Sequence, residues 1–376
     1  METTRRETFL SFQPPALDET EIEAVAETLR SGWLTTGPRT AELEARMREY
    51  LDAEHVLAVS SCTAALHLSL VALGVGPGDE VITTSLTWPA TANVIVHCGA
   101  TPVFADVRED TLNVDPERVA ELVTERTKAI VPVDLYGQPC DLDPLMALGL
   151  PVVEDAAHAA ESRYRGRKVG GIADATCFSL YATKNIAAGE GGLIATNRDD
   201  LADALDDLRV MRRGHGSLYD IAVPGYKANL SDVLASIALV QLDKVDAHAE
   251  IRRRHVALYE DGVAGLDGVT PVARDDRDLH ANHLFVVRVD AAGFGATRDE
   301  VQIALAEENI GTSIHFLPVH LLSAYAGRLA THQPALPVTE RAGSEVLSLP
   351  LSPAHSDDDV RDAIGALRRI HQRFAG

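Results

Sequence analysis

The chain has 376 residues, of which 46% are hydrophobic and 24% are charged, which is typical of a globular protein and long enough for one large domain and a smaller one. Its formal net charge of -22 argues against nucleic acid as a partner, because phosphate binding requires a basic surface. No apolar run reaches the roughly 18 residues of a membrane-spanning helix, and the first residues lack the apolar core of a signal peptide, so we expect a cytoplasmic protein with no membrane partner.

Short apolar runs alternate with amphipathic stretches over the first two thirds of the chain. The runs predict strands at Val56–Ser60, Glu80–Thr84, Thr101–Asp106, Ala129–Leu135, Pro151–Asp155, Ala175–Leu180 and Gly192–Thr196. The helical patterns between several of them cover Thr63–Leu73, Asp115–Arg126 and Arg198–Arg209. Strands that alternate with helices predict an α/β layer with a largely parallel sheet.

The pattern changes near Leu230, where one long helical region, Ser231–Tyr259, begins. The elements expected after it are a strand at His283–Val289, a helix at Arg298–Glu308, a short strand at Thr312–Phe316 and a helix at Ser356–Phe374. This tail is about the minimum size of a domain and predicts a second, α+β unit.

The four cysteines form no CxxC pair, and none has a histidine at metal-ligand spacing. They are Cys62, Cys98, Cys140 and Cys177. We therefore expect reduced, buried thiols and neither a metal site nor a disulfide framework.

Polar residues follow several predicted strands, at the edge of an open α/β sheet where ligands bind. Ser60–Leu66 follows one strand and opens a helix. Its small residues let backbone N–H groups approach a phosphate at the positive end of the helix dipole, although taken alone the segment is better explained by an ordinary serine or threonine N-cap. Asp155 ends an apolar strand and needs a partner for its carboxylate, either a protonated pyridine nitrogen or the next helix. His158 either contacts a ligand or packs.

Lys184 lies between an apolar strand and a glycine-rich turn. A lysine kept neutral by desolvation can attack a carbonyl carbon and form an imine, whereas most lysines are solvated surface charges. Ser179, five residues earlier, has a hydroxyl that could donate to a phosphate. Trp88, beyond the strand that ends at Thr84, could lie flat on a cofactor ring or pack in the core.

In this order, the motifs resemble the DegT/DnrJ/EryC1/StrS family of sugar aminotransferases, which have the fold type I of aspartate aminotransferase. The resemblance covers nearly the whole chain. It is also carried by Ser31–Pro38, Gly78–Ile82, Ala100–Asp106, Asp134–Gln138, Gly225–Asp232 and Gly311–Phe316. It implies a large pyridoxal-phosphate (PLP)-binding α/β domain, residues 1–245, built on a mostly parallel seven-stranded sheet, and a small C-terminal α+β domain, residues 246–376.

The resemblance also implies residue roles. Lys184 would carry PLP as a Schiff base and later act as acid and base. Asp155 would pair with the pyridine nitrogen and keep the ring an electron acceptor. Trp88 would stack on the ring, and His158 would lie close to its phenolic oxygen.

The phosphate-binding positions match Thr63 and Ser179, with Cys62 supplying at most its backbone. Asn229 or Lys227 would reach the phosphate of a neighbouring subunit, which implies a homodimer with composite active sites. The choice between these two residues is open.

The implied reaction has two halves: L-glutamate leaves its nitrogen on the cofactor as pyridoxamine phosphate, and a nucleotide-linked keto-deoxysugar then receives it. The segment with His315, Pro318 and His320 resembles the substrate-proximal region of the family, so His315 and His320 are candidate substrate contacts. Its similarity to the 4-keto enzymes favours dTDP-4-keto-6-deoxyglucose as the substrate. Candidate cations for its phosphates are Arg212, Arg213 and Lys227, unless Arg212 and Arg213 lie on a solvated helix end.

Several alternatives are open. A C-3 keto sugar or a cyclitol is a possible amino acceptor. A PLP-dependent sugar dehydratase is a further alternative, although such enzymes typically replace the lysine that is present here as Lys184. A non-catalytic PLP-binding regulator lacks support, because the chain carries no appended DNA-binding motif. A simple α/β binding protein would make the matches at Asp155, Lys184 and Trp88 coincidental.

Overall fold

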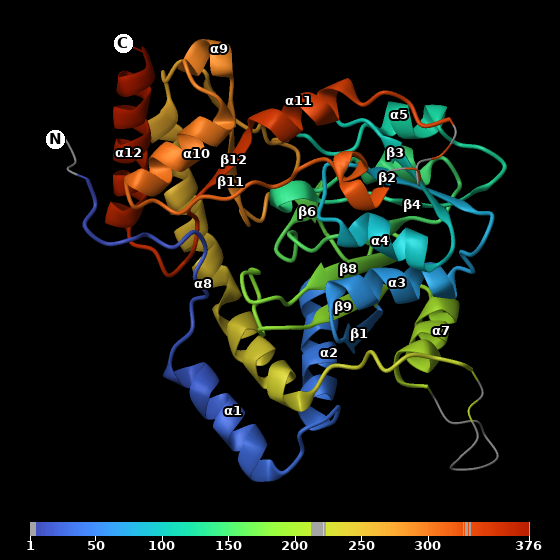
Figure 1. Ribbon diagram of the computed structural model, residues 1–376. Helices are drawn as coiled ribbons and strands as arrows, with labels where there is room; N and C mark the ends of the chain where they lie inside the picture. Colours follow the sequence, from blue (N-terminus) through green and yellow to red (C-terminus); the bar gives the residue numbers. More distant parts are fainter. Residues whose placement is uncertain are drawn as a thin grey trace.

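The structure is a computed structural model that describes residues 5–211, 221, 223–325, 327, 330 and 332–375. Figure 1 shows a larger part, with a twisted sheet between helices, and a smaller part that holds the C-terminal helix. The first described residues lie on the smaller part, because Leu10 forms a parallel bridge with Ile310 and the Arg6 guanidinium donates to Asp362 at 2.9 Å.

The larger part alternates strands and helices. Its strands are β1 (His55–Val59), β2 (Glu80–Thr84), β3 (Thr101–Ala105), β4 (Thr127–Val131), β5 (Val153–Asp155), β6 (Arg163–Tyr164), β7 (Arg167–Lys168), β8 (Ala175–Ser179) and β9 (Gly192–Thr196). Its helices are α1 (Glu19–Ser31), α2 (Pro38–Leu51), α3 (Cys62–Ala72), α4 (Ala90–His97), α5 (Pro116–Glu121), α6 (Leu142–Met146) and α7 (Asp199–Val210), with a 3-10 turn η1 (Leu135–Gly137).

One seven-stranded sheet forms from a four-stranded ladder, β1-β9-β8-β5, and a three-stranded ladder, β3-β2-β4. Parallel bridges from Ile130 to Val152 and from Val133 to Asp155 join the two ladders between β4 and β5. Strand β9 runs antiparallel to both of its neighbours, and the other pairs are parallel. The predicted mostly parallel seven-stranded sheet is therefore confirmed.

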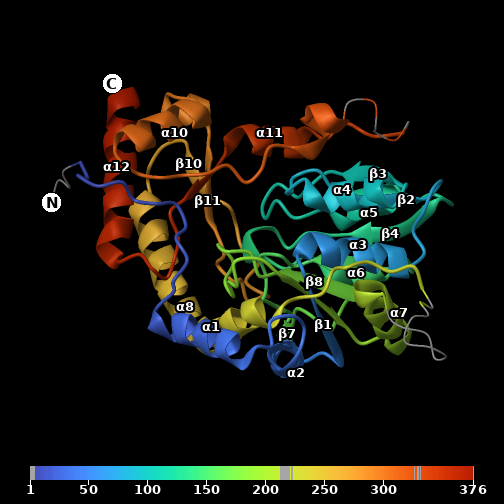
Figure 2. The same cartoon turned by 60° about the horizontal axis from the view of Figure 1, so that its bottom comes forward.

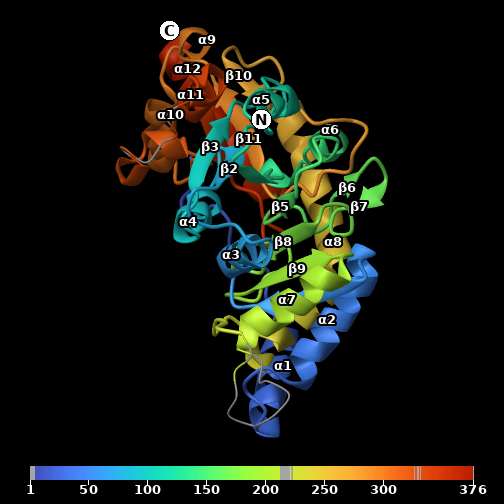
Figure 3. The ribbon, with the colours of Figure 1, turned by 90° about the vertical axis from the view of Figure 1, so that its right-hand side faces the viewer.

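Helices cover both faces of this sheet. Because successive side chains of a strand point to opposite sides, each strand packs against both helical layers. In β1, Leu57 and Val59 pack in a cluster with α3, α4 and α7. Val56 and Ala58 pack in another cluster with α2 and the long helix α8 (Asp232–Val263). Figure 3 shows the strands between these two helical layers, with α3 and α4 on one side and α2 and α8 on the other.

The smaller part is built around the C-terminal half of α8, as Figure 2 shows. Its antiparallel sheet has the order β10 (Val269–Pro271), β11 (Phe285–Val289) and β12 (Val346–Leu349). Its helices are α9 (Ala291–Phe294), α10 (Arg298–Glu307), α11 (Pro337–Glu345) and α12 (Asp357–Ala375), with 3-10 turns η2 (Val319–Leu321) and η3 (Ser323–Tyr325). The core includes Tyr259 of α8, whose ring stacks on Phe285 at 4.9 Å. The predicted boundary at residues 245/246 lies within α8 and stays a prediction.

Several predicted elements differ from the structure. The strand predicted at Ala129–Leu135 covers Thr127–Val131 instead, and Leu135 begins the η1 turn. Residues 312–316 form no strand: Ser313 makes a single bridge to Ser348, and the chain then turns toward Tyr136, whose hydroxyl donates to the carbonyl of His315. The helix predicted to reach Arg126 ends at Glu121, because hydroxyl groups near Thr124 take up backbone N–H groups in a turn.

Across the described ranges, no helix is both long enough and apolar enough to cross a membrane. Within the same ranges, no group of three or more His, Cys, Asp or Glu side chains is arranged to hold a metal ion.

Candidate active site

The predicted site residues gather at the carboxyl ends of the parallel strands. Asp155 ends β5, Ser179 ends β8, and Thr63 lies in the first turn of α3, which follows β1. Lys184 lies in the connection between β8 and β9, whose ends are held by hydrogen bonds from Leu180 N–H to Gly191 and from Ala182 N–H to Gly189. The sheet topology thus brings three segments of distant sequence to one edge.

Asp155 faces α3 and α4, on the same side of β5 as Val153. The Thr91 hydroxyl donates to its Oδ2 at 2.8 Å, and the Ala157 N–H donates to its Oδ1 at 3.2 Å. The Cys62 thiol lies 3.9 Å from Oδ1. Burial outweighs these hydrogen bonds and the nearby Lys184 amine, and it raises the pKa of the Asp155 carboxyl. A buried carboxylate with neutral donors fits a cationic ligand atom.

The N-terminus of α3 forms the adjacent wall. Ser61 is the N-cap, and its hydroxyl accepts from Ala64 N–H at 3.1 Å, while Thr63 is exposed. The Cys62 side chain points inward, because its thiol also donates to the carbonyl of Cys177 at 3.6 Å. Gly192 lets β9 approach this turn: an added Cβ would lie 2.4 Å from the Ser61 carbonyl carbon.

Lys184 holds a desolvated amine. Burial lowers the pKa of Lys184 to about 8, against the opposite effects of Cys62 and Asp155. Its Nζ lies 3.5 Å from Nε2 of His283, a residue from the segment just before β11. A larger share of the amine is therefore neutral at physiological pH than for a solvated lysine, which favours attack on a carbonyl carbon.

His158 and His283 lie beside this amine with their ring centroids 4.4 Å apart. Nδ1 of His158 accepts from Tyr136 N–H at 3.3 Å. Burial, together with the Lys184 charge, lowers the pKa of both histidines well below the ordinary value, so both rings are neutral. Neutral imidazoles can each donate one hydrogen bond and accept another.

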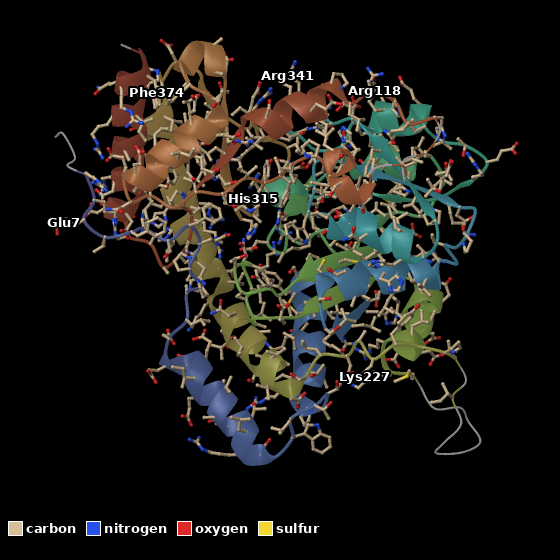
Figure 4. The ribbon with its side chains drawn as sticks, viewed as in Figure 1. Glu7, Arg118, Lys227, His315, Arg341 and Phe374 are labelled. Carbon is tan, nitrogen blue, oxygen red and sulfur yellow. The ribbon has the colours of Figure 1, made fainter. Side chains whose placement is uncertain are left out.

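Aromatic rings line the entrance of the site. The Trp88 side chain is 64% exposed and lies 6.2 Å from Phe316, which in turn lies 6.1 Å from His158. His315, labelled near the centre of Figure 4, bonds through Nδ1 to the Ser348 hydroxyl at 2.8 Å. An exposed tryptophan ring has a free face on which a planar ligand can stack, so the stacking role of Trp88 stays a prediction.

The other predicted substrate and subunit contacts lie further out. Both ring nitrogens of His320 have protein partners, Ser85 at 2.7 Å and Glu340 at 3.3 Å, so this histidine anchors the η2 turn. The exposed Lys227 amine bonds to Asn229, and Asn229 forms a bridge with Val59 of its own chain. The predicted contacts from Arg212 and Arg213 lie outside the described residues.

Three residues of the site were not predicted from the sequence: Thr91, Tyr136 and His283. Thr91 lies on α4 and Tyr136 in η1, and each contacts the site through one hydrogen bond. A buried histidine just before an apolar strand is the one signal that could have drawn attention to His283. The thiol of Cys62 also approaches Asp155, although only its backbone was expected to take part.

The fold, with a lysine and a buried carboxylate at the sheet edge, is that of an aminotransferase. The chain belongs to the DegT/DnrJ/EryC1/StrS aminotransferase family, whose model matches residues 15–368. The predicted family, fold class and enzyme class are thereby confirmed.

Three similar proteins illustrate the match. The spore coat polysaccharide biosynthesis protein SpsC of Bacillus subtilis is 45% identical over 97% of this chain and 98% of its own. The putative sugar aminotransferase Spr1654 from Streptococcus pneumoniae, in its PLP form, superposes with a TM-score of 0.90 at 34% identity, over 97% and 99% of the two chains. DesI, solved in the presence of its TDP-sugar product, has a TM-score of 0.90 at 35% identity, over 98% and 94%.

Proposed function

We propose that this protein is a PLP-dependent transaminase that moves an amino group from L-glutamate to a nucleotide-linked keto-deoxysugar. The proposed acceptor is dTDP-4-keto-6-deoxyglucose, which would give the 4-amino-4,6-dideoxy sugar. The observation that carries the proposal is the pairing of a desolvated amine, Lys184, with a buried carboxylate, Asp155. The two groups are close enough for Asp155 to raise the pKa of the amine, and the donors that hydrogen-bond to Asp155 are neutral. The family match and the TDP-sugar named for DesI support the substrate class.

The residues of the site fit PLP in their charge and chemical type. Thr63 and Ser179, with the N-terminus of α3, would bind the phosphate. Asp155 would hold a proton on the pyridine nitrogen, because a cation there offsets the cost of burying its carboxylate. Trp88 would cover one face of the ring. When bound, PLP supplies an electron-accepting ring that stabilises negative charge on the substrate carbon.

The side chains around that ring would divide the remaining tasks. Lys184 would bind the cofactor and then carry a proton between substrate atoms as an acid and base. His158, whose Nδ1 already accepts from Tyr136, keeps Nε2–H as a donor for an oxygen of the ligand. His315 would contact the sugar near the entrance, and His320 would hold that segment in place.

A homodimer with composite active sites forms part of the proposal. Lys227 is labelled in the lower half of Figure 4, away from His315 near the centre. Exposed apolar side chains on α1, in the segment that follows it and next to Lys227 are available to a second copy of the chain: Ile22, Leu29, Trp33, Leu34 and Tyr226. Asn229 or Lys227 would then bind the phosphate of the partner's site.

Mixing two inactive variants tests the composite site. A dimer that combines one Lys184→Ala chain with one Asn229→Ala chain has one site with both defects and one intact site if Asn229 serves the partner. Activity above that of either parent dimer is therefore expected. If each site takes both residues from one chain, the mixed dimer gains nothing.

The enzymatic proposal is tested by an absorbance spectrum of the purified protein. Wild type should show the band of lysine-bound PLP at about 410–430 nm and lose it when glutamate is added, whereas Lys184→Ala should lack that band. A protein that stays colourless with added PLP would contradict the proposal. The glutamate-treated enzyme is then offered 4-keto and 3-keto dTDP sugars and a cyclitol ketone. Conversion of the 3-keto isomer alone would refute the C-4 assignment, and release of ammonia with a deoxy sugar would indicate a dehydratase.

A further inference from the structure

A chain of buried hydrogen bonds lies behind Lys184. Nε2 of His283 is 3.5 Å from the Lys184 amine, and Nδ1 of the same ring is 3.0 Å from Oδ1 of Asn185. The Asn185 amide nitrogen lies 2.7 and 2.9 Å from the two carboxylate oxygens of Glu161 and 3.1 Å from the carbonyl of Ala281. Arg252 donates to Glu161 at 3.2 Å and closes the chain.

The chemistry of these partners determines which polar atoms of Asn185 and His283 carry the hydrogens. A carboxylate paired with Arg252 and a backbone carbonyl can only accept, so the group of Asn185 that faces them must be its NH₂. Its carbonyl oxygen therefore faces His283, and Nδ1 of His283 must donate. Because burial keeps His283 neutral, its Nε2 has no hydrogen and presents a lone pair to the Lys184 amine.

The neighbouring His158 has the opposite arrangement. Its Nδ1 accepts from Tyr136 N–H, so the neutral ring has its hydrogen on Nε2. The two adjacent imidazoles therefore differ in function: His158 can donate toward the ligand space, and His283 can accept from the lysine. This difference assigns separate tasks to two residues of the same type.

We propose that His283 is the positioning residue of Lys184, with a ring that Asn185 and Glu161 lock as a hydrogen-bond acceptor for the lysine amine. The proposal rests on the role proposed above for Lys184. Accepting from the amine orients it and stabilises its protonated form, which limits how far burial reduces its basicity. The other titratable groups that face Lys184 or His283 are Asp155 on β5, Cys62 on α3, His158 after β5, Arg252 on α8 and His315 before η2.

The test measures the pH dependence of Lys184 labelling in the full-length apoprotein. The chain has five lysines, so an amine-reactive probe followed by peptide mass spectrometry resolves each one: Lys128, Lys168, Lys184, Lys227 and Lys244. His283→Phe should lower the midpoint for Lys184 by about one pH unit, because the ammonium loses a charge-assisted hydrogen bond. His283→Gln retains an acceptor and should restore a midpoint near that of wild type.

Two further variants separate positioning from general structural damage. Asn185→Leu releases the tautomer lock and should move the midpoint in the same direction, which also serves if His283→Phe does not fold. His371→Phe, in α12 against Phe294, changes a histidine far from the lysine and should leave the midpoint unchanged. Equal midpoints in wild type and all folded variants would overturn the proposal.

A separate measurement keeps this inference apart from the proposed function. Borohydride reduction of the PLP-treated wild type followed by peptide mapping shows whether Lys184 binds PLP. Binding without a midpoint shift in the variants overturns the role of His283 alone. A midpoint shift without binding supports that role and contradicts the proposed function.

Discussion

Gly192 is the position where one added methyl group should disturb the site most directly. It begins β9 between the ends of β1 and β8, where it pairs with Val59 and Ser179. In Gly192→Ala the new Cβ would lie 2.4 Å from the Ser61 carbonyl carbon and 2.6 Å from the Cys62 nitrogen, both backbone atoms. Relief requires the α3 N-terminus to move by about 1 Å, and such overpacking costs about 1–3 kcal/mol of unfolding free energy.

This displacement should weaken phosphate binding more than ring binding. If α3 moves away, the phosphate loses a hydrogen bond from an N–H group, which is worth about 1.5 kcal/mol for a charged acceptor, or about tenfold in affinity. The assay compares the dissociation constants of PLP and pyridoxal, which lacks the phosphate, together with urea unfolding. Gly76→Ala is the matched control, because its Cβ meets nothing within 4 Å. If Gly192→Ala and this control have the same unfolding free energy and the same ratio of PLP to pyridoxal dissociation constants, the reasoning is refuted.

Three further predictions concern titrating groups. Burial raises the pKa of Asp155 in the folded apoprotein, so the folded state binds a proton that the unfolded chain has released, and the unfolding free energy falls as pH rises through that pKa. Asp155→Asn should therefore flatten the pH dependence of urea unfolding above about pH 4, the ordinary pKa of an aspartate, and parallel curves would contradict this. The rate at which PLP binds the apoprotein should rise about tenfold per pH unit and level off near the Lys184 pKa of about 8; a rise that continues to the range of free lysine would exclude a lowered pKa. Burial raises the pKa of all four thiols, that of Cys98 to about 11. A thiol reagent at pH 8 should therefore react with four cysteines only after the protein is unfolded, and rapid reaction with the native protein would contradict this.

The sequence predicted the central sheet well because its strands are short apolar runs between clear turn residues. Two strands, Glu80–Thr84 and Gly192–Thr196, were predicted to the residue. The antiparallel direction of β9 was not predicted, because a run of apolar residues carries no direction. The edge strands β10 and β12 were missed, since three or four residues give too short a pattern to separate from loops.

The site could be predicted only where a residue follows a strand. Asp155 and Lys184 met this condition, and the structure brings both to the same sheet edge. Thr91 and His283 could not be predicted in this way, because each reaches the site through a partner that is distant in the chain. Thr91 is 64 residues from Asp155, and His283 is 99 residues from Lys184. Such pairings arise from the packing of α4 and of the segment before β11 against the sheet, which a local pattern cannot express.

The antiparallel strand β9 has a consequence for the entropy of the site. Because β9 runs antiparallel to β8, no helical crossover separates them, and the segment with Lys184 is a loop, residues 180–191, with both ends fixed in adjacent strands. The loop-closure entropy of this segment is lost when the sheet folds and not when a ligand binds. Substituting glycine for Ala187 and Ala188 would make this loop less ordered in the unbound state. Part of the entropic cost of ordering Lys184 would then reduce the affinity for the ligand.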